Sequence, residues 1–164
     1  MRRVASSFLA AFLAVLAVPA AAQSYPTRPI RYVVPFAPGG GNDILGRVVA
    51  QKLNEAFGVP VVVDNRGGAG GTLGTDLTAK APPDGYTMLI NNVSLAVNVT
   101  LYPKLPYDTL KDLEPVTLVG RQPNILVVHP ALPAKSVREL LALARAKPGQ
   151  ITFGSGGTGS SSHL

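Results

Sequence analysis

Residues 35–43 form a glycine-rich loop of a type that can bind an anion. The loop, Pro-Phe-Ala-Pro-Gly-Gly-Gly-Asn-Asp, lies between a β-prone apolar run over 30–34 and an amphipathic run over 44–57. Glycine lets the backbone approach a ligand closely. The first N–H groups of a helix have no intrahelical partner and lie at the positive end of its dipole. This placement predicts a carboxylate site that needs no charged side chain.

Two more glycine-rich loops, at 65–71 and 154–159, each follow a predicted strand. In open α/β sheets, ligands bind outside the carboxyl ends of the strands. The recurrence of such loops therefore favours a binding cleft, although a tight turn explains any single loop equally well.

The loop at 154–159 also supports two enzyme hypotheses. Gly154, Gly156 and Gly159 match the G-x-G-x-x-G dinucleotide fingerprint, but this fingerprint normally lies in the first βα unit. The serines at 155 and 160–162 near His163 suggest a hydrolase, but no G-x-S-x-G elbow is present. We interpret His163 as a helix-start residue and His129 as structural.

Composition argues against metal and nucleic-acid chemistry. The chain has two histidines, no cysteine and no carboxylates clustered at ligand spacing, so we expect no metal site. We expect no cofactor of another kind either. The 15 Lys and Arg residues are scattered rather than gathered into a basic face, which is not typical of a nucleic-acid-binding protein.

The first 22 residues have the pattern of a cleavable signal peptide. Arg2 and Arg3 precede an uncharged apolar stretch over 4–18, and Ala20 and Ala22 fit the small-residue cleavage pattern. We therefore predict an exported protein with cleavage near Ala22 and Gln23.

The remaining chain predicts a parallel α/β sheet. Strands are expected at 30–34, 59–63 and 86–90, and helices at 44–57 and 72–80, in the order β-α-β-α-β. Asn42 or Asp43 is the expected N-cap of the first helix, and Gly58 its expected end. For Asp43, capping and ligand contact remain equally good interpretations.

Residues 101–115 are expected to be irregular, and strands and a helix are predicted again beyond them. Strands are predicted at 116–120, 124–128 and 151–153, and a helix at 136–146 with Ser136 and Glu139 as a capping box. The serines and the threonine of 155–162 are typical of a helix start, but the sequence ends before a helix could follow. We therefore interpret the chain as part of a longer protein.

Several segments resemble the Bug-type solute receptors, the periplasmic binding components of tripartite tricarboxylate transporters. The resemblance begins with Pro29-Ile30-Arg31 and the Val34–Gly40 loop, with Asp43 and Arg47 beyond. It extends over most of the remaining chain through the segments 61–71, 81–87, 101–108, 133–136 and 157–164. One departure is the Gly67-Gly68 pair, where the family usually has a proline after the arginine.

This resemblance implies a periplasmic-binding-protein-like (type II) α/β fold of two hinged domains with parallel-rich sheets. The first domain would comprise residues 23–107, completed by later return strands, and the second would begin at 108–164. The family role would be capture of a small organic carboxylate between the domains and its delivery to membrane transporter subunits by a monomeric receptor.

The resemblance also implies two loops that grip a carboxylate through N–H groups, hydroxyls and water. We name 36–43 the first pincer loop and 155–161 the second pincer loop. The residues predicted to bind the ligand are Phe36, Ala37, Pro38, Gly39, Gly40, Asn42, Asp43, Asn91, Ser94, Ser155, Gly156, Gly157, Thr158, Gly159 and Ser160.

The leading hypothesis is therefore an exported carboxylate receptor that is not an enzyme. The alternatives are an exported α/β hydrolase, a dinucleotide-dependent enzyme, or a fragment with no function of its own.

Overall fold

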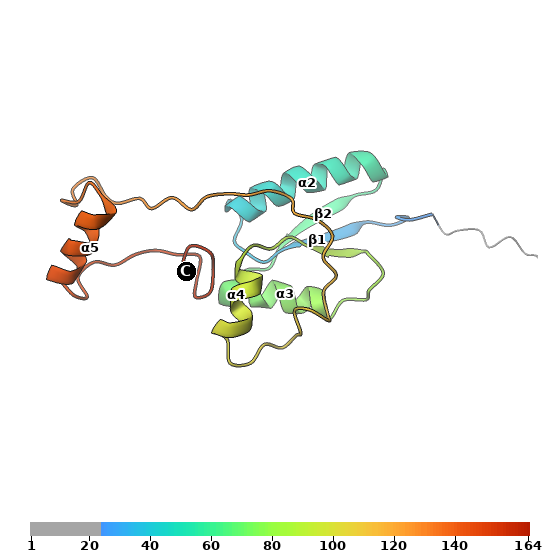
Figure 1. Cartoon of the computed structure of the whole chain (residues 1–164). Helices are drawn as coiled ribbons and strands as arrows, with labels where there is room; N and C mark the ends of the chain where they lie inside the picture. Colours follow the sequence, from blue (N-terminus) through green and yellow to red (C-terminus); the bar gives the residue numbers. More distant parts are fainter. Residues whose placement is uncertain (1–23) are drawn as a thin grey trace, which may run out of the picture.

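A computed structural model describes residues 24–164 of the chain (Figure 1). The predicted signal peptide and its cleavage point lie outside these residues. Within them, three helices and three strands form a layered unit. A fourth helix stands apart from this unit, and a long extended segment on each side of the helix connects the two (Figure 1).

The centre of the layered unit is a parallel sheet in the order β2-β1-β3. The strands are β1 (Ile30–Val34), β2 (Val61–Asn65) and β3 (Thr87–Leu89). β1 has a neighbour on each side, and Ile30, Val33 and Val34 are fully buried. Apolar residues without alternation suit such a strand, because both of its faces are covered. The predicted β-α-β-α-β order is confirmed.

The first helix, α2 (Gly41–Phe57), covers one face of the sheet (Figure 1). Ala50 packs with Tyr32, Val34 and Ile90 in the core, and Leu45 and Val49 border this cluster. The helix ends as predicted at Gly58, whose φ of 68° is left-handed.

The prediction that Asn42 or Asp43 caps α2 is wrong. The N-cap is Gly40, and no side chain caps the helix, which starts three residues earlier than the periodicity suggested. The Asp43 carboxylate is used elsewhere, as described below. β2 also starts two residues later than predicted, because its pairing with β1 begins at Val61, after Pro60.

The other face of the sheet is covered by α3 (Thr72–Ala79), which follows a short 3₁₀ turn, η1 (Ala69–Gly71). A further helix, α4 (Ser94–Leu101), follows β3 and was not predicted. Its β-branched residues are weak helix formers, so the sequence carried little helix signal there. Asn98, which is buried, ties α4 to η1 by donating to the Gly70 carbonyl over 3.1 Å.

The strands predicted at 116–120, 124–128 and 151–153 are absent from the described residues, where the chain runs extended without a ladder. A strand requires a neighbour for its N–H and C=O groups. The apolar side chains of these segments are exposed, as shown by Val116 and Ile125, each 80% exposed.

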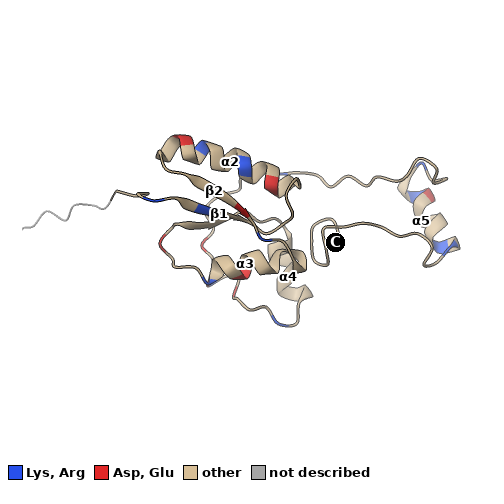
Figure 2. Cartoon of the chain, turned by 180° about the vertical axis from the view of Figure 1, so that it is seen from behind, with Lys and Arg blue, Asp and Glu red and all other residues tan. Residues whose placement is uncertain are grey.

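The last helix, α5 (Val137–Ala146), confirms the predicted element. The Ser136 hydroxyl accepts from the Glu139 N–H over 3.2 Å, while the Glu139 carboxylate accepts from the Lys135 N–H over 2.7 Å. Blue and red residues are both present on α2 and on α5 and do not form a field of one sign (Figure 2). From Ser24 onward, no helix is both long and apolar enough to cross a membrane.

Candidate carboxylate-binding cleft

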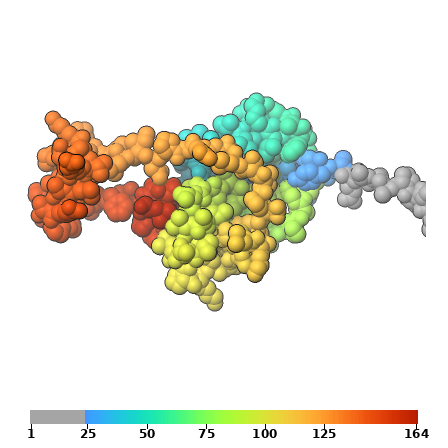
Figure 3. All heavy atoms as spheres, in the orientation of Figure 1, coloured from blue at the N-terminus to red at the C-terminus, as the bar shows by residue number. Residues whose placement is uncertain are grey.

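A cleft of about 810 Å³ lies where the first pincer loop, the end of β3 and the C-terminal segment meet. Figure 3 shows the C-terminal residues packed against the atoms of the α4 region on this side of the molecule. The cleft contains no Asp or Glu among its described lining residues. The lining comprises Phe36, Ala37, Pro38, Gly40, Gly41, Asn42, Leu45, 89–93, 117–122, Asn124, Gly156 and 160–162.

The first pincer loop brings the N-terminus of α2 to the cleft. The first hydrogen bond of the helix runs from the Ile44 N–H to the Gly40 carbonyl over 3.0 Å. The N–H groups of the helical residues before Ile44 therefore have no carbonyl partner within the helix. Asn42 adds a donor, because its side-chain nitrogen is buried and has no hydrogen-bond partner in residues 24–164. A buried donor without an acceptor costs free energy. Asn42 is therefore a candidate donor to a bound ligand, since the residue belongs to the cleft lining.

Asp43 holds this loop from behind. Its carboxylate accepts from the Gly39 N–H (2.8 Å), Arg47 Nε (3.0 Å) and Asn65 Nδ2 (2.9 Å). The Arg47 bond, followed by those from Gly39 and Asn65, lowers the pKa of Asp43 to about 2. Asp43 is buried and absent from the cleft lining, and its contacts are with the loop, with Arg47 of α2 and with the strand end.

The second pincer loop folds on itself and docks on α4. The Gly156 N–H donates to Ser162 Oγ over 2.9 Å, and the Ser160 N–H donates to the Gly157 carbonyl over 3.0 Å. The Tyr102 hydroxyl donates to the Thr158 carbonyl over 3.0 Å. Gly70 of η1 faces this carbonyl so closely that an added Cβ would overlap it.

Two asparagines connect the second loop to other walls of the cleft. Asn92, after β3, lies 3.4 Å from Ser161 Oγ, and Asn124 donates to the Ser161 carbonyl over 2.9 Å. Asn91 instead donates to the Thr75 hydroxyl of α3 over 2.9 Å. The residues that follow β3 thereby connect to α3 and to the second pincer loop.

The predicted site residues divide into two groups. Those on the cleft lining are Phe36, Ala37, Pro38, Gly40, Asn42, Asn91, Gly156 and Ser160. The other predicted residues are not part of the lining: Gly39, Asp43, Ser94, Ser155, Gly157, Thr158 and Gly159. Ser94, for example, is fully buried and bonds to Asn92 Oδ1.

Sequence reasoning missed the cleft wall formed by 117–122 and Asn124. Arg121 and Gln122 follow the apolar run 116–120, and the rule that ligands bind beyond strand ends could have indicated them. Arg121 is the only charged residue of the described lining.

The geometry gives no support to the enzyme hypotheses. The G-x-G-x-x-G segment lacks the preceding strand and the following helix that a dinucleotide site requires. Within 24–164, no hydrogen bond joins His163 to a serine side chain, and its ring lies 6.2 Å from that of Phe153. His129 accepts from the Ala131 N–H over 3.1 Å, which is a local turn contact.

Comparison with known protein families agrees with this geometry. Residues 45–164 match the family model described as the tripartite tricarboxylate transporter family receptor. The chain belongs to this family. The resemblance found in the sequence is thereby confirmed, and the family is one of transporter receptors.

Individual relatives extend the match to the first pincer loop. Protein BugT of Bordetella pertussis is 48% identical over 151 residues, which are 91% of this chain and 46% of BugT. An R. palustris protein, Rpa4515, solved with adipate, is 38% identical with a TM-score of 0.78. The periplasmic binding protein BugD is 34% identical with a TM-score of 0.73.

The two solved structures confirm the fold class, a periplasmic-binding-protein-like α/β fold with a parallel sheet. The match covers 84% of this chain and 46% of the adipate-bound protein, and 85% and 46% for BugD. The chain thus spans just under half the length of these relatives.

Proposed function

We propose that this protein is a receptor that binds a small organic carboxylate in the cleft and delivers it to the membrane subunits of a tripartite transporter. The observation that carries the proposal is the unpartnered, buried Asn42 Nδ2 beside the N-terminus of α2, in a cleft lined by no Asp or Glu in residues 24–164. Such a site favours an anion without the aid of a metal.

The arrangement of the walls supports a cleft between two domains. The core of the sheet and its helices lies within residues 23–107, which we propose as the first domain. The second domain would begin in 108–164, which supplies the second pincer loop and the 117–122 wall. Closure around a carboxylate would exclude water and strengthen each polar contact.

The proposed role is binding without catalysis. A receptor needs donors fixed around the ligand, which the first pincer loop and the serines at 160–162 supply. It needs no nucleophile activated by a base. We also propose that the protein is a monomer in the periplasm, exported by a signal peptide at 1–22 that is cleaved between Ala22 and Gln23. Mass spectrometry of the periplasmic protein would test the cleavage point.

Adipate is the first ligand to test, because it occupies a relative of similar fold. Isothermal titration of the purified protein with adipate should give saturable binding, whereas the neutral diamide of adipate should not bind. Asn42→Leu keeps the size of the side chain but removes the donor, and should weaken binding about tenfold.

The matched control is Asn54→Leu, at the far end of the same helix and away from the cleft. It should leave affinity unchanged. Equal binding of adipate and its diamide, or no carboxylate binding across a panel of mono-, di- and tricarboxylates, would refute the proposed function.

A further inference from the structure

We propose that Asn65 is a positioning residue that fixes the first pincer loop in the shape needed to bind an anion. This inference rests on the proposed function for its binding consequence only. Asn65 is not part of the cleft lining, so its effect on a ligand would be indirect.

The backbone of Asn65 is itself well fixed. It is the last residue of β2 and pairs with Val34, the last residue of β1. The next N–H, that of Arg66, donates to the Val34 carbonyl over 2.8 Å. β1 ends at Val34 and the first pincer loop begins two residues later, so Asn65 lies beside the start of the loop.

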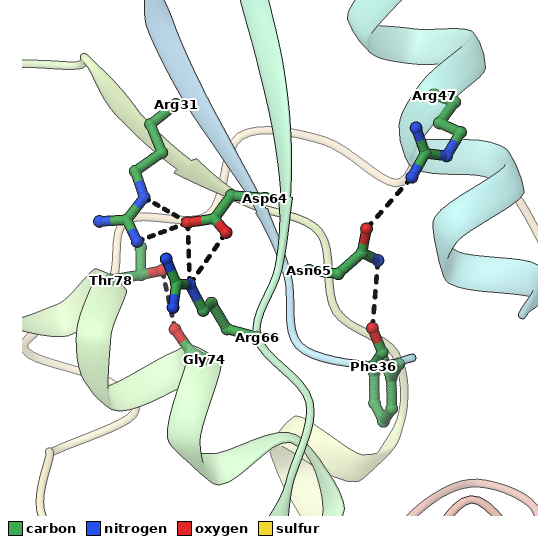
Figure 4. Close-up of polar contacts among 8 residues, drawn as sticks. All are labelled: Arg31, Phe36, Arg47, Asp64, Asn65, Arg66, Gly74 and Thr78. Carbon is green, nitrogen blue, oxygen red and sulfur yellow. Dashed lines mark hydrogen bonds and ion pairs between the residues drawn. The ribbon is translucent and has the colours of Figure 1, made fainter. Parts of the chain in front are cut away.

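The Asn65 side chain joins the two ends of the loop. Its Nδ2 donates to the Phe36 carbonyl at the start of the loop (3.1 Å) and to Asp43 Oδ1 in the first turn of α2 (2.9 Å). Its Oδ1 accepts from Arg47 Nη2 over 3.2 Å. Figure 4 shows Asn65 between Arg47 and Phe36. Both donor hydrogens and the acceptor of the amide are therefore used.

The contact continues from Asp43 into the middle of the loop. Asp43 is buried and accepts from the Gly39 N–H over 2.8 Å. A rigid strand end thus holds the loop at residues 36, 39 and 43. The residues between these points, with Pro38 and Gly40 on the cleft lining, are then ordered before a ligand arrives. A binding site that is ordered in advance loses less entropy on binding.

The adjacent Asp64 provides a matched control. It points to the other side of β2, where it accepts from Arg31 Nε (2.7 Å) and Arg66 Nε (2.9 Å). Within residues 24–164, none of its hydrogen bonds reaches the first pincer loop (Figure 4). Asp64→Asn weakens a polar cluster at the same strand end but leaves the loop contacts in place.

The first test uses the protein without ligand. Amide hydrogen exchange by NMR should show Gly39 exchanging at least about tenfold faster in Asn65→Leu than in the wild type, since Asp43 loses one of its fixed partners. Asn65→Ser is a milder variant that cannot reach both partners, and should show the same change. In Asp64→Asn, exchange at Gly39 should stay within about twofold.

The second test is adipate titration of the same variants. Asn65→Leu and Asn65→Ser should bind about tenfold more weakly, and Asp64→Asn should bind as the wild type does. Unchanged exchange at Gly39 in both Asn65 variants, or affinity losses matched by Asp64→Asn at equal loss of stability, would overturn the proposal. Failure of the wild type to bind any carboxylate would refute the proposed function alone, because the exchange comparison would still decide the role of Asn65.

Discussion

The two pincer loops are held in different ways. The first is fixed by side chains, through the Asp43 carboxylate, Arg47 and Asn65. The second is fixed mainly through its backbone, by the Tyr102 bond to the Thr158 carbonyl and by the close approach of Gly70. The first network therefore contains charge, whereas Tyr102 and Gly70 bring none to the second.

The two loops also differ in how far apart their anchors lie along the chain. The first loop is held by residues no more than 29 positions away, all within one β-α-β unit. The second depends on Tyr102, 56 positions before Thr158. We expect the first loop to be formed whenever the sheet is folded, and the second to separate from α4 without unfolding the sheet. That difference suits a receptor that opens and closes on its ligand.

The largest effect is expected for Gly70→Ala. The φ of Gly70 is +61°, and a Cβ there would overlap the Thr158 carbonyl oxygen. Left-handed strain and steric overlap together should lower the free energy of unfolding by about 2–4 kcal/mol and weaken adipate binding. Urea unfolding and calorimetry would measure the two effects.

Gly149→Ala is the control for Gly70→Ala. Gly149 also has a left-handed φ, of +74°, but a Cβ there would meet nothing within 4 Å. This variant should lose only the strain, about 1–2 kcal/mol, and keep its affinity. Equal losses in both variants would show that the contact between Gly70 and the second loop has no energetic importance.

A smaller, pH-dependent effect is expected for Asp43→Asn. Hydrogen bonds from Arg47, Gly39 and Asn65 lower the pKa of Asp43 from its ordinary 3.8 to about 2 in the folded protein. The ionised carboxylate therefore stabilises the fold above about pH 4, and this contribution is lost as the pH falls towards 2. Melting temperatures should show the wild type more stable than Asp43→Asn at pH 6, with the gap closing at lower pH.

The control for Asp43→Asn is Glu55→Gln on the exposed surface of the same helix, where Glu55 pairs with Lys52 over 2.6 Å. An exposed pair of this kind contributes little, so this variant should melt close to the wild type. A constant gap between Asp43→Asn and the wild type from pH 6 to about pH 2 would contradict a role for the charge.

The elements around the first loop could be predicted because their signals are local. Apolar periodicity and Gly58 indicated β1 and α2, and the β-prone run at 59–63 indicated β2 within two residues. By contrast, α4 has little local helix signal and packs on η1 through a long-range contact from Asn98 to Gly70, and the segments 116–120 and 124–128 need strand partners. Neither requirement can be read from a short stretch of sequence.

The candidate site was predictable to a similar degree. A glycine loop between a strand and a helix indicated the first pincer loop. Asn65 was not indicated, because an amide at a strand end has no pattern of its own until the register places it beside Phe36. The role of Asp43 was also missed, since three partners from separate segments hold its carboxylate.

The smallest effect is expected for Tyr102→Phe, which removes only the hydroxyl that donates to the Thr158 carbonyl. This bond is exposed to solvent, so its loss should cost about 0.5–1 kcal/mol of stability. Adipate binding should weaken several-fold, because the second loop would leave α4 more readily. Calorimetry and urea unfolding would measure both.

Tyr25→Phe tests whether the loss of adipate affinity depends on where in the molecule the hydroxyl is removed. The Tyr25 hydroxyl also donates to a backbone carbonyl, that of Gly85, over 2.6 Å, but at a distance from the cleft lining. Its removal should cost similar stability and leave adipate affinity intact. If Tyr102→Phe and Tyr25→Phe bound adipate equally, docking on α4 would not set the position of the second loop, and backbone anchoring would have to come from Gly70 and Asn124 instead.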